Sequence, residues 1–350
     1  MLRLELPYFF EVSRSRAAEI TVVPYNQRAA EAIEWAKIHK ILPISRSTGQ
    51  PKIAVVGIDY QLTFCNPQVN ELFVSGNNGE GSILDSVRMA EFIYRYIHLI
   101  TKTIWTLDTH NIWQIFYPLF WVDKEGFNNP APYTNITYED VRDGKWKPNP
   151  RLSFVLGRDP FYWHEYALHY TKRLKNTNRY DLIIWPYHAM TGSVGNALTP
   201  ILDEASFFHS IVRMAEREFQ FKGNDSKTEN YSVFQPEIMT DHLRVVFNEP
   251  NWKLIELLKE FDMVIFGGEA GDYCLPWSIE DFLSQLEDPN QAKKLYLLED
   301  TTSPVVVGGY NGTDNMKAAF GRFQEAGMNI VKSTDPIETW PNIGGIGLKI

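Results

Sequence analysis

The sequence predicts a three-layer α/β/α fold built on a doubly wound, mostly parallel sheet of about six strands. Continuous apolar, β-branched runs, such as residues 53–59 and 263–268, are typical of strands that are covered on both faces. These runs alternate with segments of helical periodicity along most of the chain. Alternating strands and helices imply right-handed crossovers, which make the strands parallel and place helices on both faces of one sheet.

The composition is that of an ordinary globular protein. The chain has 350 residues, 44% of them hydrophobic and 22% charged, which excludes chain-wide disorder, collagen and coiled coil. Its net charge of −9 comes without a basic cluster, so we expect neither nucleic acid nor a membrane as a partner. Cys65 and Cys274 are far apart, which indicates neither a disulfide framework nor a four-cysteine zinc site. A soluble, cytoplasmic protein is therefore the expectation.

Residues 1–50 precede the first predicted strand and form an N-terminal extension. An amphipathic helix is expected over residues 26–39, because apolar residues recur there at helical spacing. The residues on or near its apolar face are Ala29, Ala32, Ile33, Ala36 and Ile38.

The remaining elements follow from the same two periodicities, short apolar runs for strands and longer 3.6-residue patterns for helices. After the strand at residues 53–59, the expected elements in chain order are a helix over 82–100, a strand over 102–107, a helix over 162–174, a strand over 181–185, a strand around Phe219 and Phe221, a helix over 251–259, a strand over 263–268, a helix over 277–286, a strand over 295–300, a helix over 314–326 and a strand over 328–333.

One segment interrupts this alternation. Residues 111–180 are rich in Pro, Asn, Tyr and Trp and show little clean periodicity outside the helical stretch. Segments of this length are usually functional lids or inserted subdomains. We therefore expect a single domain over residues 51–335 with an insertion at 111–180, followed by a tail at 336–350.

Polar residues follow several of the predicted strands, at the sheet edge where α/β proteins place their active groups. Asp59 follows the first strand, and it is either a helix cap or a functional carboxylate. Asp108 and His110 follow the second, and their spacing points both side chains the same way on an extended segment. With His188, they would form a two-histidine, one-carboxylate set suited to zinc, iron or manganese. A plain Asp–His hydrogen bond and a structural His188 remain the alternatives.

Cys274 lies where a small-residue turn after the strand at 263–268 runs into a helix. The first N–H groups of a helix are unpaired and carry positive potential, which favours a thiolate and a neighbouring oxyanion. The alternative is an inert buried cysteine. Lys222 ends another predicted strand, and it is either solvated or buried beside a carboxylate and the thiol. Cys65 has no such setting.

Five segments occur in a fixed order within residues 53–332. They are DYQLTF from Asp59, LDTH ending at His110, WPYHAMTGSVGNAL around His188, FKGNDSKTENYSVF around Lys222 and GGEAGDYC ending at Cys274. In content and order they resemble the motifs of the nicotinamidases and the wider isochorismatase-like cysteine hydrolases. The resemblance implies the isochorismatase-like hydrolase fold.

The resemblance also implies a covalent mechanism. Asp59 would be the general base, Lys222 would hold Asp59 and the thiolate in place, and Cys274 would form a thioester with a carboxamide. Backbone N–H groups of Ala270 and Cys274 would bind the oxyanion, next to a cis peptide bond between Glu269 and Ala270.

The same resemblance implies a divalent metal, zinc in the first place and iron or manganese otherwise, that orients a pyridine ring. Asp108, His110 and His188 would hold the metal, and Glu229 would stand beside it or approach it. The residues expected to wall the flat ring are Phe64, Trp185 and Tyr231.

Two departures from the family pattern bear on the substrate. Thr109 replaces the usual Trp between the metal-binding Asp and His, which alters the expected pocket wall. Glu269 replaces a Val or Leu and places a charge near the oxyanion turn.

Three hypotheses follow, all with a homo-oligomer as the expected assembly. The first is a nicotinamidase, which converts nicotinamide to nicotinate and ammonia. The second is a related cysteine amidohydrolase for another small carboxamide or heteroaromatic amide, which the two departures and the insertion favour. The third is a non-enzymatic relative, which the presence of Asp59, Lys222 and Cys274 disfavours.

Overall fold

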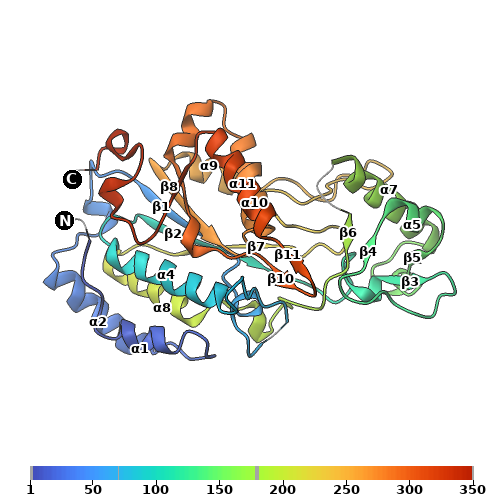
Figure 1. The fold of residues 1–350 in the computed structure, drawn as a ribbon, viewed down its shortest axis with the longest axis horizontal. Coiled ribbons are helices and arrows are strands. Elements are labelled where there is room, and N and C mark those ends of the chain that lie inside the picture. Colours follow the sequence, from blue (N-terminus) through green and yellow to red (C-terminus); the bar gives the residue numbers. More distant parts are fainter. Residues whose placement is uncertain (1–2, 70, 178–180, 349–350) are drawn as a thin grey trace.

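The computed structural model describes residues 3–69, 71–177 and 181–348, and a six-stranded sheet lies at its centre (Figure 1). The strand order is β12-β9-β8-β1-β2-β7, and every neighbouring pair is parallel, which confirms the predicted fold class. The chain runs outward from β1 to β2 and β7, then returns to the other side of β1. The strands are β1 (Ile53–Ile58), β2 (Lys102–Asp108), β7 (Glu218–Lys222), β8 (Met263–Gly268), β9 (Leu295–Leu298) and β12 (Asn329–Val331).

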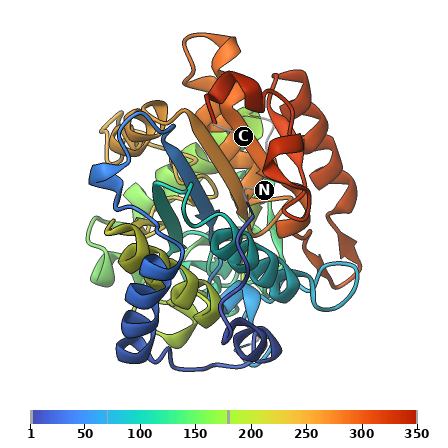
Figure 2. The same cartoon turned by 90° about the vertical axis from the view of Figure 1, so that its left-hand side faces the viewer.

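Helices cover both faces of the sheet, as Figures 1 and 2 show. Successive residues of a strand point to opposite faces, so the fully buried β1 feeds two cores. Ala54 and Val56 belong to one core, whereas Ile53 and Val55 belong to the other. The first core is covered by α9 (Trp252–Lys259), α10 (Cys274–Ser284) and α11 (Thr313–Glu325), and the second by α4 (Gly81–Arg95) and α8 (Pro200–Arg213).

The N-terminal extension contains α1 (Phe10–Ser15) and α2 (Tyr25–Ile38), and α2 packs against α8. The helix prediction is confirmed, but the predicted apolar face is partly wrong. Ala32 is buried, whereas Ile33 and Ile38 are 52% and 64% exposed. A buried ion pair takes their place, because Arg28 Nε lies 2.6 Å from Glu204 Oε1 of α8.

The inserted segment carries its own small elements, which lie together at one end of the molecule (Figure 1). Its aromatic side chains, among them Phe120, Trp121 and Tyr166, belong to the same core as α9 to α11. Residues 178–180, the predicted end of the insertion, lie outside the described residues. The elements are β3 (Trp121–Asp123), β4 (Asn135–Ile136), α5 (Tyr138–Arg142), β5 (Trp146–Pro148), α6 (Leu152–Val155) and α7 (Pro160–Thr177).

The predicted strand at residues 181–185 is not part of the central sheet. Only Leu182–Ile183 (β6) is a strand, and it pairs antiparallel with β4 of the insertion. The sheet position beside β2 is occupied by β7 instead. The apolar run of this segment has the pattern of a strand that is covered on both faces of a sheet. In the structure, however, residues of the insertion bury it instead.

The other elements agree with the predictions to within a few residues, except that α4 ends at Arg95 rather than at residue 100. The tail packs on the sheet side of α4, where Trp340 stacks on Phe92 and Tyr296 at ring-centroid distances of 5.7 and 5.5 Å. Among the described residues, none of the helices combines the length and the apolar character that a bilayer crossing requires.

Candidate active site

Neighbouring parallel strands end at one edge of the sheet, and each contributes a polar side chain there. Asp59 follows β1 directly, and Cys274 begins α10 beyond β8. Asp108 and Lys222 are the last residues of β2 and β7 and face each other in register. Because the chain changes direction between β1 and β8, Asp59 and Cys274 flank the crevice where open α/β sheets bind ligands.

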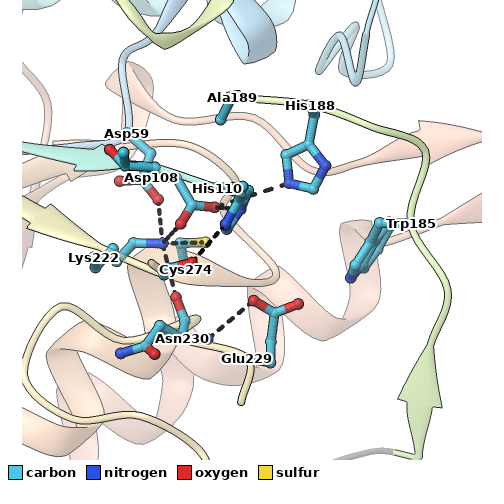
Figure 3. A network of polar contacts seen from close by, with 12 residues as sticks. Asp59, Asp108, His110, Trp185, His188, Ala189, Lys222, Glu229, Asn230 and Cys274 are labelled. Atoms are coloured by element: carbon cyan, nitrogen blue, oxygen red, sulfur yellow. Dashed lines mark hydrogen bonds and ion pairs between the residues drawn. The ribbon is translucent and has the colours of Figure 1, made fainter. Parts of the chain in front are cut away.

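The Lys222 ammonium lies at the centre of this group (Figure 3). Its Nζ atom is 2.9 Å from Asp59 Oδ2 and 3.1 Å from Asp108 Oδ1, and it donates to the Asn230 carbonyl at 2.8 Å. Cys274 Sγ lies 3.6 Å from the same atom. Lys222 is buried, so carboxylates rather than water balance its charge.

Burial sets the protonation of the cysteine. It raises the pKa of the Cys274 thiol well above its usual range, although the Lys222 charge opposes the shift. The start of α10 therefore does not by itself produce a thiolate, and a nearby base has to take the proton. Asp59 is such a neighbour, since one of its oxygens lies within 4.8 Å of Cys274 Sγ. Burial raises the pKa of Asp59 as well, which brings its proton affinity closer to that of a thiol.

Thr106 holds the Asp59 carboxylate, a role that the sequence analysis missed. Its Oγ1 donates to Asp59 Oδ1 at 2.5 Å and accepts from the Asp59 N–H at 3.0 Å. Thr106 is two residues before Asp108 on β2, so both side chains point to the same face. The alternation of side chains along the predicted strand is the sequence feature from which this role of Thr106 could have been predicted.

Gln61 and Asn196 were missed in the same way. The Gln61 side chain donates to the Asp108 carbonyl and accepts from the Asp108 N–H, at 2.7 Å each. Asn196 also donates to the Asp108 carbonyl, at 2.7 Å. These bonds anchor the end of β2. Gln61 lies within the DYQLTF motif, whose spacing alone predicts no contact with β2.

Asp108, His110 and His188 form a second cluster, which we call the metal trio. One ligand atom of each lies within 4.8 Å of the others, and all three residues are buried. Asp108 Oδ2 is 3.0 Å from His110 Nε2 and 3.9 Å from His188 Nε2. Asp108 therefore belongs to both clusters, since its other oxygen faces Lys222.

The trio fits a divalent metal ion. Nδ1 of His110 lies 2.9 Å from the Gly223 carbonyl, and Nδ1 of His188 lies 2.8 Å from the Pro186 carbonyl. A carbonyl only accepts, so each Nδ1 carries a hydrogen, and in the neutral ring this leaves the Nε2 lone pair turned to the cluster. Burial lowers the pKa of His110, but the Asp108 carboxylate outweighs that effect and raises it, so His110 gives up a proton when it binds a metal. Burial lowers the pKa of His188 to about 3, which keeps that ring neutral. A Cβ at Gly223 would lie 2.6 Å from Asp108 Oδ1, so a glycine keeps the space open.

His188 does not follow a strand of the main sheet, and a backbone contact with His110 positions it instead. The backbone of His110 forms an isolated parallel bridge with Met190, in which His110 N–H donates to the Ala189 carbonyl at 3.0 Å. The Tyr117 hydroxyl also donates to the His188 carbonyl at 2.8 Å. The expectation that His188 follows a neighbouring sheet strand is wrong, but the structure still brings it to the metal trio.

A narrow pocket of about 40 Å³ is lined by Cys274 and by Asp108 and His188 of the metal trio. The structure places Phe64, Trp185 and Tyr231 in its wall, where the resemblance had put them. The Phe64 ring meets His188 edge-on at 5.7 Å, and Trp185 Nε1 donates to the Tyr231 hydroxyl at 3.1 Å. The wall residues that were not foreseen are Leu72, Val74, Tyr273 and Val305.

Glu229 also lines this pocket. Its Oε1 accepts from the Asn230 N–H at 2.9 Å, and burial raises its pKa to about 7, with the His110 charge opposing the shift. Glu229 therefore stands beside the metal trio as a carboxyl that can hold or release a proton near neutral pH.

Glu269 and Ala270 are joined by a cis peptide bond. Ala270 lines the pocket, and within the described residues neither its N–H nor that of Cys274 donates to a backbone carbonyl. The Glu269 carboxyl turns away and accepts from the Ser303 N–H at 3.3 Å, close to Asp85. Burial raises the pKa of Glu269 well above its usual range, so it does not bring a negative charge to the oxyanion turn.

Two further residues lie outside the pocket wall. The Thr109 hydroxyl donates to the Leu107 carbonyl and accepts from Asn196, both at 3.1 Å. Thr109 therefore does not line the pocket, because the alternation of side chains that continues beyond β2 turns it away from Asp108 and His110. That the loss of a Trp at this position alters the pocket wall stays a prediction. Cys65 is buried beside α4, and burial raises its pKa well above the usual range.

No protein-family model matches the sequence, and no curated protein matches it significantly. Among solved structures, a nicotinamidase/pyrazinamidase of Acinetobacter baumanii is 17% identical over 82% of this chain and 99% of its own, with a TM-score of 0.46. The yeast nicotinamidase is 17% identical over 80% and 99%, with a TM-score of 0.49. The pyrazinamidase of Pyrococcus horikoshii, solved in complex with zinc, is 15% identical over 81% and 99%, with a TM-score of 0.42.

Proposed function

We propose that this protein is a metal-dependent cysteine amidohydrolase that converts nicotinamide to nicotinate and ammonia. The observation that carries the proposal is the buried Lys222 ammonium, which lies 2.9 Å from Asp59 and 3.6 Å from Cys274. A base, a nucleophile and a positioning cation thus meet beneath a pocket that Asp108 and His188 of the metal trio also line. This is the arrangement that acyl transfer through a thioester requires.

The reaction begins when Asp59 takes the proton of Cys274 and the sulfur attacks the carboxamide carbon. The carbonyl oxygen becomes negatively charged, and the N–H groups of Ala270 and Cys274 donate to it. The carbon–nitrogen bond then breaks, Asp59 returns the proton to the nitrogen, and ammonia leaves a thioester. Water next loses a proton to Asp59 and attacks the thioester, which releases the carboxylate and restores the thiol.

The remaining residues position the substrate. A divalent metal on the trio, zinc in the first place and iron or manganese otherwise, would supply a Lewis-acid contact to the ring nitrogen. Phe64, Trp185 and Tyr231 present flat surfaces to an aromatic ring. Lys222 keeps Asp59 and the sulfur at their working distance.

The test is ammonia release from nicotinamide by metal-replete protein. We expect Cys274→Ala to abolish release, because no other thiol lines the pocket in the described structure. Cys65→Ala is the matched control, and its rate should stay within about twofold of wild type, since Cys65 lies outside the pocket. Undiminished release by Cys274→Ala would rule out the thioester route.

A further inference from the structure

The candidate catalytic pocket adjoins a second, much larger cavity. Its volume is about 430 Å³, against about 40 Å³ for the inner pocket. Trp185, Tyr273 and Val305 line both, so the two spaces share a wall. A volume of this size is typical of sites for small organic molecules, which run from about 300 to 1,000 Å³. A lone pyridine carboxamide at Cys274 leaves this outer space empty.

Aromatic rings dominate the wall of the outer cavity. Tyr133 meets Trp185 edge-on at 6.1 Å, Trp185 meets Tyr273 at 5.5 Å, and Tyr273 lies 6.3 Å from Tyr310. Such a chain of rings offers both faces and edges to a planar guest. The polar members of the wall are Asn135 and Asp181, which are hydrogen-bonded to each other at 3.0 Å.

Segments outside the central sheet hold these rings in place. Tyr133 comes from the inserted segment, and its N–H donates to the Ile184 carbonyl at 2.5 Å. Tyr310 comes from the hairpin of β10 (Val306–Val307) and β11 (Tyr310–Asn311), and its hydroxyl donates to Asp272 at 2.9 Å. Figure 1 shows this hairpin and the β4–β6 pair at the same end of the sheet. The insertion and the hairpin therefore form the wall of the outer cavity, and hydrogen bonds fix the position of its aromatic rings.

We propose that the preferred substrate is a carboxamide larger than nicotinamide, whose reacting carbonyl enters the inner pocket while a second planar, aromatic group occupies the outer cavity. This inference rests on the proposed amidohydrolase function and specifies its substrate class. The chemistry is unchanged: the carbon–nitrogen bond breaks, the sulfur of Cys274 and then water take the acyl group, and Asp59 passes its proton to the leaving nitrogen. The products are a carboxylate and ammonia or an amine.

The test compares kcat/KM for three amides on metal-replete protein. Nicotinamide has no second ring, N-benzylnicotinamide carries one on the nitrogen, and 5-phenylnicotinamide carries one on the acyl side. We expect at least one aryl amide to exceed nicotinamide by tenfold or more. Tyr133→Ala should lower that ratio about fivefold, since it removes one aromatic contact. Val307→Trp, which fills the outer cavity, should abolish the advantage of the aryl amide, so that its kcat/KM no longer exceeds that of nicotinamide.

Phe127→Ala is the matched control, because Phe127 is an exposed aromatic residue of the same insertion and lies outside both cavities. It should leave the ratio unchanged. The inference fails, and the proposed function stands, if nicotinamide is hydrolysed and neither aryl amide has a higher kcat/KM. The inference also fails if Tyr133→Ala and Val307→Trp leave the ratio of the two kcat/KM values unchanged. If none of the three amides is hydrolysed although Cys274 reacts with iodoacetamide, the proposed function fails with it.

Discussion

At the scale of single residues, one buried cation connects the two clusters of the candidate site. Lys222 contacts Asp59 on one side and Asp108 on the other, so the proposed base and a proposed metal ligand share one counter-charge. Burial opposes the charge of Lys222, but Asp108 and Asp59 outweigh that effect and raise its pKa well above the usual range. The sequence predicted Lys222 at a strand end, but its contact with Asp108 depends on the pairing of β2 with β7.

Thr106→Val keeps the shape of the side chain and removes its hydrogen bonds to Asp59. We expect kcat/KM to fall roughly 10- to 100-fold, because a hydrogen bond to a charged group contributes about 1.5–3 kcal/mol. Steady-state kinetics would measure the loss. Thr103→Val is the matched control, since Thr103 is also buried on β2 and, within the described part of the chain, its Oγ1 has no hydrogen-bond partner. Equal losses in the two variants would show that Thr106 acts by packing alone.

His188→Ala removes one of the three proposed metal ligands. We expect metal content, measured by plasma mass spectrometry after dialysis, to drop at least tenfold. Loss of a hydrogen-bond partner of a ligand already weakens metal affinity by about 10- to 100-fold, and loss of the ligand itself should weaken it at least as much. His164→Ala, on α7 and outside the trio, should retain the wild-type content. Unchanged metal in His188→Ala would contradict the assignment of the trio.

At the scale of elements, α2 of the N-terminal extension carries a buried ion pair to α8, beside the buried Phe9 and Phe10 of the same extension. Arg28 of α2 lies 2.6 Å from Glu204 of α8 and 2.7 Å from Glu31 of its own helix. The Arg28 guanidinium also packs 3.7 Å from the centre of the Phe9 ring. A periodicity argument assigns such a position to the solvent face, because it does not include the partner helix.

Arg28→Met should lower the free energy of unfolding by about 3–5 kcal/mol, since it leaves Glu204 buried without its partner. Urea denaturation would measure this change. Arg14→Met serves as the control, because Arg14 is exposed and lies 4.0 Å from Glu11; its effect should be below about 0.5 kcal/mol. Similar effects in the two variants would mean that the Arg28 pair contributes no more than a surface contact.

At the scale of the whole molecule, a buried acid makes folding sensitive to pH. Burial raises the pKa of Asp85 to about 7, with Ser303, Glu269 and Arg88 opposing the shift. In the unfolded chain this carboxyl ionises near its ordinary pKa of 3.8. Between these two values the folded state binds more protons, so the free energy of unfolding falls as pH rises from about 4 to about 7.

Asp85→Asn should remove this dependence. For wild type we expect a loss on the order of 2 kcal/mol between pH 5 and pH 7, measured by urea denaturation, and a smaller loss in the variant. Asp335→Asn, a change at an exposed carboxyl, should keep the wild-type slope. A wild-type slope in Asp85→Asn would show that other groups, Glu269 first among them, carry the effect.

The sequence by itself determined the parallel α/β fold, the bounds of most elements and the candidate site. Strand and helix periods are local properties, and a strand end brings its following residue to one edge of the sheet. Asp59, Asp108, Lys222 and Cys274 could therefore be predicted together. The same reasoning named His188, although the strand predicted before it lies outside the main sheet. The order of five motifs added the pocket wall. The division into an extension, a domain with an insertion and a tail stays a prediction.

Only the tertiary structure decided the features that depend on contacts between segments far apart in the chain. It placed β6 beside β4 rather than in the main sheet, and it brought His188 to His110 through an isolated bridge. It turned Glu269 away from the pocket and joined the insertion to the hairpin around an aromatic cavity. Such contacts arise between segments with no shared period, so their geometry follows from packing and burial, which no local pattern in the sequence contains.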